Sequence, residues 1–367
     1  GADGEYLTDR LTIEANRFIT ENKDKPFFLY LSHYAVHDPI QGRQDLVKKY
    51  EEKLAKMEKP AGLPYILEGN PDDKNPLTRE ELDCMIETNK YSGFKLLPNN
   101  TVKIKQFQDN VQFAAMVESL DESVGRVLAK LKELGLEENT IVIFVSDNGG
   151  MSAGNFGNPG RVIPKDRLDQ SFATSNLPLR AAKGFLYEGG IRVPLIVKWP
   201  NKGKVNVISD VPAISVDFYP TILEMVGVNV GTLNHITDGQ SLVPIISADK
   251  KVKSNPAVRP IFWHFPHYSN HGLQSPGGAI RLGDYKLLDY FENNTVQLFN
   301  LKNDPGEQYD LSKTEPEKAK ELKALLDQWR KDVNAQMMPP NPDYDPKANP
   351  GDYNTRNMPI KMEGTFI

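Results

Sequence analysis

The protein has 367 residues, of which 39% are hydrophobic and 25% charged, and its formal net charge is −5 at pH 7. This composition is enough for one large core or two domains, and the negative balance argues against a nucleic-acid partner. No apolar run reaches the roughly 18 residues that a membrane span needs. The single cysteine, Cys84, excludes a disulfide within the chain.

The first two thirds of the chain alternate between helical patterns and short apolar runs. Apolar residues recur at helical spacing over residues 8–21, 106–134 and 216–226. Residues 27–31 and 141–145 are instead unbroken apolar runs, which favour strands buried on both faces. We therefore expect an α/β domain over residues 1–255, with a predominantly parallel sheet sandwiched by helices. The chain opens directly on a helical pattern, so we expect the N-terminal part of this domain to be missing.

The composition changes near residues 249–260, and a different pattern follows. Three apolar stretches are typical of antiparallel strands, at residues 261–265, 279–288 and 296–301. Residues 316–333 repeat leucines and a tryptophan at helical spacing, and this stripe needs an apolar partner. The pattern predicts a C-terminal α+β subdomain over residues 256–338 with a small antiparallel sheet. Residues 339–367, rich in proline and asparagine, are expected to form an extended tail.

Polar chemistry follows the apolar run at residues 141–145. Asp147 and Asn148 offer hard oxygens to a cation such as calcium, and the two glycines after them let the backbone approach closely. The carboxyl ends of strands are also where open α/β sheets bind their ligands. A tight Asp-Asn-Gly turn is the alternative interpretation, and these residues alone leave both open.

His37 and Lys183 carry the remaining chemistry of this part of the chain. His37 follows the apolar run at residues 27–31, and Lys183 precedes a later one. A shared sheet edge would bring both near Asp147, where a cation and an N–H donor can stabilise a tetrahedral oxyanion. The alternatives are a histidine that caps a loop and an ordinary solvated lysine.

Several segments resemble the type I sulfatases of the alkaline-phosphatase-like superfamily. FVSDNGG at residues 144–150 and LRAAKGFLYEGGIRVPLIVKWP at residues 179–200 resemble the central signatures of that family. PFFLYLSHYAVHDPIQ at residues 26–41 resembles its upstream histidine strand. AIRLGDYKLL and LFNLKNDPGEQYDLS match later landmarks in order, so the resemblance covers nearly the whole chain.

The resemblance implies a sulfuric ester hydrolase that acts on sulfated carbohydrate with calcium as cofactor, in a periplasmic, secreted or lysosomal location. Asp147 and Asn148 resemble two of the calcium ligands of the family. Lys183 resembles the lysine that grips a sulfate oxygen, and His37 the histidine beside the sulfate and the leaving-group oxygen. In the family mechanism a hydrated formylglycine attacks sulfur while calcium holds the sulfate oxygens.

Two further histidines, His264 and His267, lie between aromatic residues in the stretch WHFPHY. From the residues alone, a place in the core or at its rim is as open as a ligand role. The resemblance places them where relatives often contact the sugar. They are therefore expected as substrate-binding residues.

The chain departs from the family at the nucleophile. Formylglycine is made from Cys or Ser in a C/S-x-P-x-R motif, but Cys84 is followed by Met-Ile-Glu, and SNLPLR at residues 175–180 is one residue too long. The early aspartate pair of the calcium site is also missing. We therefore expect this chain alone to be inactive although its parent is a sulfatase. The alternatives are a phosphoryl or phosphonate ester hydrolase of the same superfamily, or a non-catalytic fragment that binds sulfated glycan.

A sheet that lacks its first strands exposes unpaired edges. We therefore expect this chain to self-associate, or to pair with a missing N-terminal segment.

Overall fold

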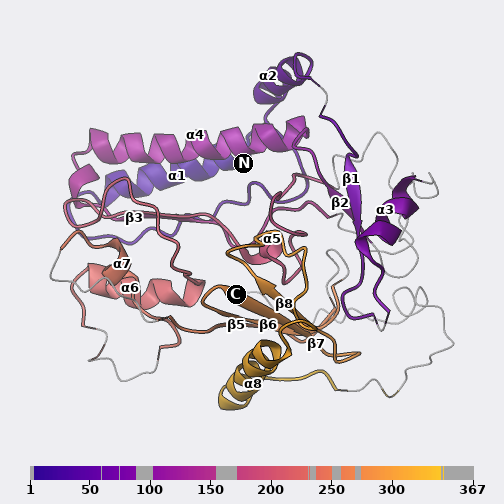
Figure 1. Ribbon diagram of the computed structural model, residues 1–367. Coiled ribbons are helices and arrows are strands. Elements are labelled where there is room, and N and C mark those ends of the chain that lie inside the picture. The colour runs from indigo at the N-terminus through magenta and orange to yellow at the C-terminus, as the bar shows by residue number, and fades with distance from the viewer. Residues whose placement is uncertain are drawn as a thin grey trace.

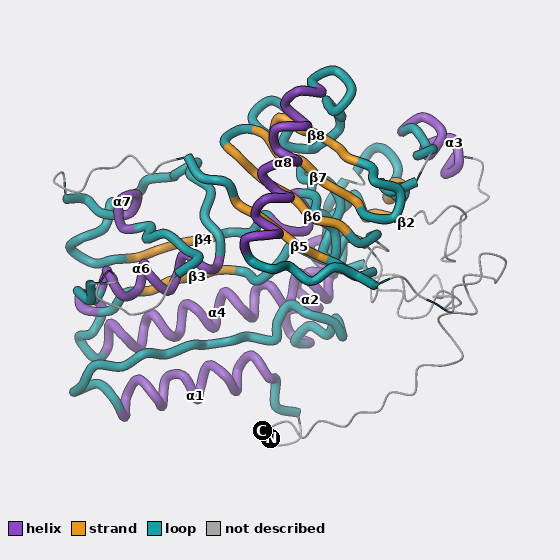
Figure 2. The backbone as a smooth tube through the Cα atoms, turned by 90° about the horizontal axis from the view of Figure 1, so that it is seen from below, coloured by secondary structure: helices purple, strands orange, loops and turns teal. Residues whose placement is uncertain are grey.

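The computed structural model describes residues 4–58, 60–73, 75–87, 102–153, 172–229, 231, 237–249, 258–268, 274–339 and 342. Helices α1 (Leu7–Glu21) and α4 (Val111–Glu133) run side by side along one side of the molecule, and a four-stranded sheet with helix α8 lies on the other (Figure 1). Between them lies a short two-stranded ladder. Figure 2 shows the same arrangement from below.

The helical layer forms because α1, α2 (Gln44–Leu54) and α4 each have an apolar stripe. Both α1 and α2 pack on α4, the longest of these helices. Asn110 caps α4, since its side-chain oxygen accepts a hydrogen bond from the backbone N–H of Phe113 at 3.0 Å. Gly135, with φ of +70°, follows its last turn. Helices α1 and α4 lie where the helical spacing predicts them, within five residues at either end.

The prediction of a buried strand at residues 27–31 is wrong. This segment is extended but has no strand partner among the described residues, and it runs alongside α1 and α4 (Figure 2). Phe27 packs edge-on against Phe18 of α1, with ring centroids 6.0 Å apart. Phe28 and Tyr30, which point the other way, are 70% and 80% exposed. The helices therefore cover one side of the apolar run, whereas burial of the other side needs a neighbouring strand.

Strand β3 (Val142–Val145) pairs antiparallel with β4 (Leu195–Lys198), with Val145 opposite Leu195. The apolar run at residues 141–145 predicts a strand buried on both faces, and this prediction is wrong. Val145 of β3 is 41% exposed, and Ile196 of the paired strand β4 is 63% exposed. No parallel pair occurs among the described strands, since β1 (Tyr65–Glu68) and β2 (Val102–Lys105) also pair antiparallel. Shorter helices complete this part, namely α3 (Arg79–Glu87), α5 (Glu188–Ile191), α6 (Phe218–Met225) and α7 (Val243–Ile246).

The C-terminal sheet has the order β5-β6-β7-β8, with every neighbouring pair antiparallel. Its strands are β5 (Ile261–Phe265), β6 (Gly277–Leu282), β7 (Tyr285–Tyr290) and β8 (Val296–Asn300). Gly283, with φ of +61°, makes the tight turn between β6 and β7. The predicted small antiparallel sheet is therefore present, and the stretch at residues 279–288 forms two of its strands.

The two faces of this sheet bury different clusters. On one face, Ile280, Leu287 and Leu298 pack against α8 (Pro316–Asp332), as the leucine stripe of that helix requires (Figure 2). On the other face, Ala279, Leu288 and Phe299 join Phe185 and Tyr187 in the largest core cluster. This second cluster draws residues from both sides of the expected boundary at 256, so the sheet shares a core with the preceding part of the chain.

Within the described residues, no helix combines the length and the apolar character needed to cross a bilayer. The expected tail at residues 339–367 lies almost entirely outside the described residues.

Candidate functional site

The Asp147–Gly150 turn and the Lys183 segment are joined through their backbones. The N–H of Lys183 donates to the carbonyl of Gly150 at 3.1 Å, and the N–H of Gly149 donates to the carbonyl of Gly190 at 2.9 Å. A Cβ on Gly149 would overlap the carbonyl oxygen of Gly189, and a Cβ on Gly190 that of Phe185. Glycine is therefore required at position 149 by the close approach of the two segments, and at position 190 by the tight turn of the Lys183 segment itself. This packing fixes Lys183 beside the end of β3.

Lys183 meets His37, although the two residues are far apart in the sequence. The Nζ of Lys183 lies 2.6 Å from Nε2 of His37. An ammonium group can only donate, so Nε2 accepts and Nδ1 carries the ring proton. Nδ1 donates to the backbone oxygen of Asp38 at 2.9 Å and lies 2.8 Å from its Oδ1. The ring is therefore oriented on its far side by the backbone carbonyl of Asp38, while Lys183 is half-buried and His37 is open to solvent.

Asp147 and Asn148 lie in the turn itself. The Oδ1 of Asp147 accepts from the N–H of Asn148 at 2.8 Å, and Nδ2 of Asn148 donates to the carbonyl of Gly149 at 2.9 Å. The turn is therefore present. Oδ2 of Asp147 and Oδ1 of Asn148 accept no hydrogen bond from the described residues and are available to a cation. These hard oxygens suit calcium, which takes about six to eight such ligands. The described residues contain no cluster of three or more His, Cys, Asp or Glu suited to a metal. The two residues thus fit part of a calcium site.

Asn176 holds the site together and has no role in our sequence interpretation. Its Nδ2 lies 2.8 Å from the carbonyl oxygen of Gly150, 3.2 Å from that of Ala181 and 3.1 Å from that of Gly189. One amide group therefore bridges the turn and both ends of the Lys183 segment. A lone asparagine in a loop gives no sequence signal of this kind, since its three acceptors lie on distant backbone carbonyls.

A buried ion cluster lies behind the Lys183 segment. Lys286 of β7 contacts Glu188 Oε1 at 3.0 Å and Glu307 Oε1 at 2.9 Å, and none of the three side chains is more than 3% exposed. Arg180 pairs with Glu68 at 2.5 Å, donates to the carbonyl of Glu307 at 2.7 Å and lies over the ring of Tyr187. Burial raises the pKa of the Glu307 carboxyl above its usual value. Helical or strand periodicity could not identify this cluster.

His264 and His267 lie on and just after β5. The Nε2 of His264 contacts the carbonyl oxygen of Gln336 at 2.7 Å, and its ring leans on Phe291. His267 is exposed and lies over Phe265, with ring centroids 3.8 Å apart. No hydrogen bond among the described residues joins either histidine to His37 or Lys183. Their expected substrate contact stays a prediction.

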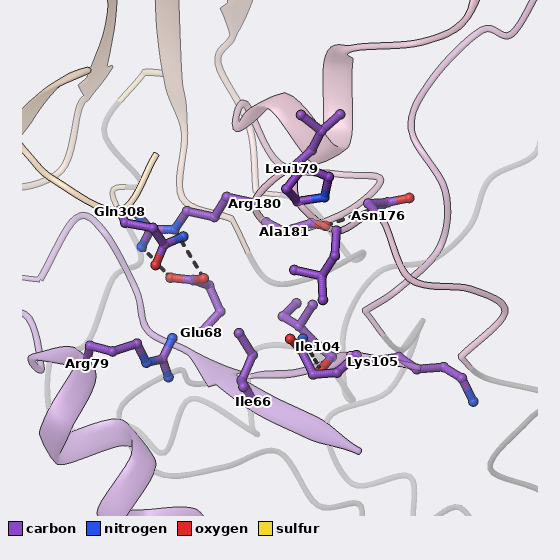
Figure 3. Close-up of a pocket in the computed structure, with 13 residues that line it drawn as sticks. Ile66, Glu68, Arg79, Ile104, Lys105, Asn176, Leu179, Arg180, Ala181 and Gln308 are labelled. Carbon is purple, nitrogen blue, oxygen red and sulfur yellow. Dashed lines mark hydrogen bonds and ion pairs between the residues drawn. The ribbon is translucent and has the colours of Figure 1, made fainter. Parts of the chain in front are cut away.

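A small pocket opens near the buried ion cluster (Figure 3). Glu68, Asn176 and Arg180 are among its lining residues, and Figure 3 shows the Arg180–Glu68 pair at one end. Its cavity volume is about 30 Å³. A water needs about 10–15 Å³ on this measure, so the pocket suits one or two waters and no sugar. His37 and Lys183 do not line it, and the candidate active site is the open surface around their contact.

Compared with family profiles and with known proteins, the chain matches sulfatases. A family profile described as "Sulfatase" matches residues 2–228, and one described as "N-sulphoglucosamine sulphohydrolase, C-terminal" matches residues 181–334. The chain is 31% identical over 328 residues to a protein named "Sulfatase" from Formosa agariphila, covering 85% of this chain and 47% of that protein. It is 25% identical over 371 residues to "N-acetylglucosamine-6-O-sulfatase" from Bacteroides thetaiotaomicron, covering 89% of this chain and 62% of that protein.

A solved structure shows the same fold. The crystal structure titled "Ps i-CgsB" aligns with a TM-score of 0.60 and 27% identity, over 89% of this chain and 55% of that one. Together with the family profile, this likeness confirms the α/β fold class with a C-terminal α+β part. The chain spans only about half to three fifths of the length of these proteins. On the family profile, which matches well over half of its residues, the chain belongs to the sulfatase family.

Proposed function

We propose that the protein of which this chain forms part hydrolyses sulfate esters of carbohydrates. The observation that carries the proposal is the 2.6 Å contact between Lys183 Nζ and His37 Nε2, beside the Asp147–Asn148 turn. A lysine and a histidine that share one open face match what a sulfate ester presents, namely anionic oxygens next to a leaving alcohol. Membership of the sulfatase family supports this reading over other anion-binding roles.

In this proposal, Lys183 and His37 divide the work. The ammonium group of Lys183 binds a sulfate oxygen and stabilises the charge that develops on the transferring sulfuryl group. When Lys183 turns to the sulfate and the His37 ring is protonated at Nε2, that atom donates its proton to the leaving-group oxygen, which departs as an alcohol. Because Nδ1 donates to the backbone oxygen of Asp38, the ring orientation is fixed. The bound ester then replaces Lys183 as the partner of Nε2.

Asp147 and Asn148 are proposed to hold a calcium ion, whose charge would stabilise the sulfate oxygens when it is bound. The nucleophile is proposed to be a formylglycine outside these 367 residues. Cys84 is an exposed free thiol on α3 outside any matching motif, and Ser175 is nearly buried. We therefore expect the isolated chain to lack turnover.

Two names support a carbohydrate substrate. One matching family profile is that of an N-sulphoglucosamine sulphohydrolase C-terminal region, and one relative is named an N-acetylglucosamine-6-O-sulfatase. We propose a sulfated sugar as the substrate class, with His264 and His267 as candidate contacts. A periplasmic, secreted or lysosomal location is part of the same proposal.

The test compares ester classes and chain lengths. The whole protein is assayed with 4-nitrophenyl sulfate, N-acetylglucosamine 6-sulfate and 4-nitrophenyl phosphate, and the 367-residue chain is assayed in parallel. We expect sulfate hydrolysis by the whole protein only, lost in Lys183→Ala and kept in Lys302→Ala, which removes an exposed lysine. Preferential hydrolysis of the phosphate ester would overturn the proposal. Turnover by the isolated chain would show that it contains its own nucleophile.

A further inference from the structure

The turn that carries Lys183 is closed on itself. The N–H of Gly189 donates to the carbonyl of Arg180 at 2.8 Å, and the N–H of Phe185 donates to that of Ala182 at 3.0 Å. The loop therefore behaves as one compact unit from residue 180 to residue 190. The position of this unit relative to His37 therefore depends on its hydrogen bonds and ion pairs with other parts of the chain.

The C-terminal part of the chain contacts this turn through Glu188. The backbone N–H of Glu188 donates to Glu307 Oε2 at 2.6 Å, and Glu188 Oε1 accepts from Lys286 Nζ at 3.0 Å. Lys286 Nζ also lies 2.9 Å from Glu307 Oε1, which closes a triangle. All three side chains are buried, and a second contact of the same kind joins the backbone N–H of Leu186 to Gln274.

Lys286 is the single cation at the centre of this triangle. It lies on β7 with the same parity as Leu288, so its side chain faces the shared core and the Lys183 turn. The nearest other cations to Glu188 are Arg192 at 3.8 Å and Arg281 at 3.9 Å. Without Lys286, the desolvated carboxylates of Glu188 and Glu307 would face each other. Glu188 lies on the short Lys183 turn, so it is the residue that would move away.

We propose that Lys286 is a positioning residue: by holding Glu188 and Glu307 together, it sets the place of Lys183 opposite His37. The catalytic part of this inference rests on the proposed function, whereas the structural part does not. A sheet lysine more than 100 residues downstream would then control a side chain at the reaction centre. Misplacement of a catalytic group by about 1 Å typically costs about 10²-fold in rate.

The experiment uses the whole protein and the variant Lys286→Met, which keeps the length of the side chain and removes its charge. Two quantities are measured, amide hydrogen exchange over residues 181–191 and kcat/KM for a sulfate ester. The matched control is Leu322→Ala, which loosens the same sheet from its opposite face. We expect faster exchange in the turn and about a 10²-fold lower kcat/KM in Lys286→Met, and neither change in folded Leu322→Ala.

A pH profile separates positioning from general loosening. In Lys286→Met the two carboxylates repel each other, and burial already raises the pKa of Glu307, so protonation of Glu307 at lower pH removes the repulsion. The ratio of variant to wild-type kcat/KM should therefore rise as the pH falls. The double variant Lys286→Met/Glu307→Gln keeps an acceptor for the N–H of Glu188 and removes the repulsion, but the link through Lys286 is still lost. Its exchange should therefore lie between wild type and the single variant.

These outcomes distinguish the two proposals. Unchanged exchange in the turn of Lys286→Met overturns the positioning role, whatever the activity. If Lys286→Met does not fold, unchanged exchange in the double variant overturns it in the same way. Absence of sulfatase activity in the wild-type protein would contradict the proposed function. The hydrogen-exchange data would still decide whether Lys286 holds the turn.

Discussion

Lys183 and His37 are 146 residues apart in the sequence, yet their side-chain nitrogens lie 2.6 Å apart. Lys183 is placed by backbone bonds to the Asp147–Gly150 turn, and His37 by its contact with Asp38. Two independent loops therefore converge on one point. Replacing either residue tests the chemical role of the Lys183–His37 contact.

Replacement of Lys183 by Ala should lower the kcat of the whole protein by about 10²–10³-fold, the usual effect of removing one well-placed charge-stabilising group. His37→Ala should have a loss of similar size, because the proton exchange at the leaving oxygen is lost. Steady-state kinetics with a sulfate ester measure both. Wild-type rates in either variant would remove that residue from the reaction.

Calcium should stabilise the whole protein through Asp147 and Asn148. A ligand at 100 times its Kd adds about 2.7 kcal/mol to the unfolding free energy, which appears as a rise in Tm. Asp147→Ala should abolish the rise, whereas Asp24→Ala, which removes an exposed carboxylate elsewhere, should keep it. Differential scanning calorimetry with calcium and then with a chelator measures this. An equal calcium response in Asp147→Ala would place the ion at another site.

Asn176→Asp should destabilise the protein by about 1–3 kcal/mol, because a carboxylate would replace an amide donor that faces three carbonyl oxygens. The change keeps the size of the side chain, so lost packing does not contribute. Urea denaturation gives the free energy of unfolding, and Asn206→Asp at an exposed position serves as the control. Equal stability of the two variants would mean that the bridge contributes nothing.

His33 should make stability depend on pH. Burial lowers the pKa of His33 below 6.5, so the unfolded chain binds its proton more readily than the folded chain does. Stability should therefore rise with pH between the folded-state pKa and 6.5, and its contribution should be fully present above 6.5 and lost on acidification. NMR titration of the ring and urea midpoints across this range measure the effect. His33→Gln should flatten this part of the profile, and an unchanged slope would assign it to other groups.

Leu322→Ala should cost about 2–5 kcal/mol of unfolding free energy, since Leu322 of α8 is 1% exposed and packs against the C-terminal sheet. Leu325→Ala on the same helix, at a 39% exposed position, is the matched control and should cost much less. Denaturant titrations of both variants give the difference. Comparable losses would show that α8 does not pack as described.

The sequence predicts the periodic elements of this protein well. The helix at residues 316–333 and the strand at 261–265 are found where their patterns place them, because their apolar faces are covered by neighbours close in sequence. The run at residues 27–31 misleads for the opposite reason. Its apolar side chains predict two covered faces, but only the helices next to it are present to cover one. A local pattern indicates a need for burial, whereas burial itself depends on distant partners.

The same limit applies to the site. The motifs around Asp147 and Lys183 are identifiable because a family resemblance carries them. Lys286 lies in the matched segment AIRLGDYKLL and Asn176 in SNLPLR, but neither segment gives its residue a role. Their partners lie on other segments of the chain. Residues that bind reacting groups can be found from sequence, while residues that hold them in place need coordinates.

The close contact between Gly149 and the Lys183 turn has a consequence for protein engineering. Because Gly149 leaves no room for a Cβ against the carbonyl oxygen of Gly189 in the other loop, a loop transplanted from a relative would bring backbone angles matched to its former neighbour. Exchange of the Asp147–Gly150 turn alone, or of the Lys183 turn alone, should therefore give misassembled hybrids. Altered substrate preference by chimera construction should succeed only when residues 147–150 and 180–190 are swapped together as one cassette.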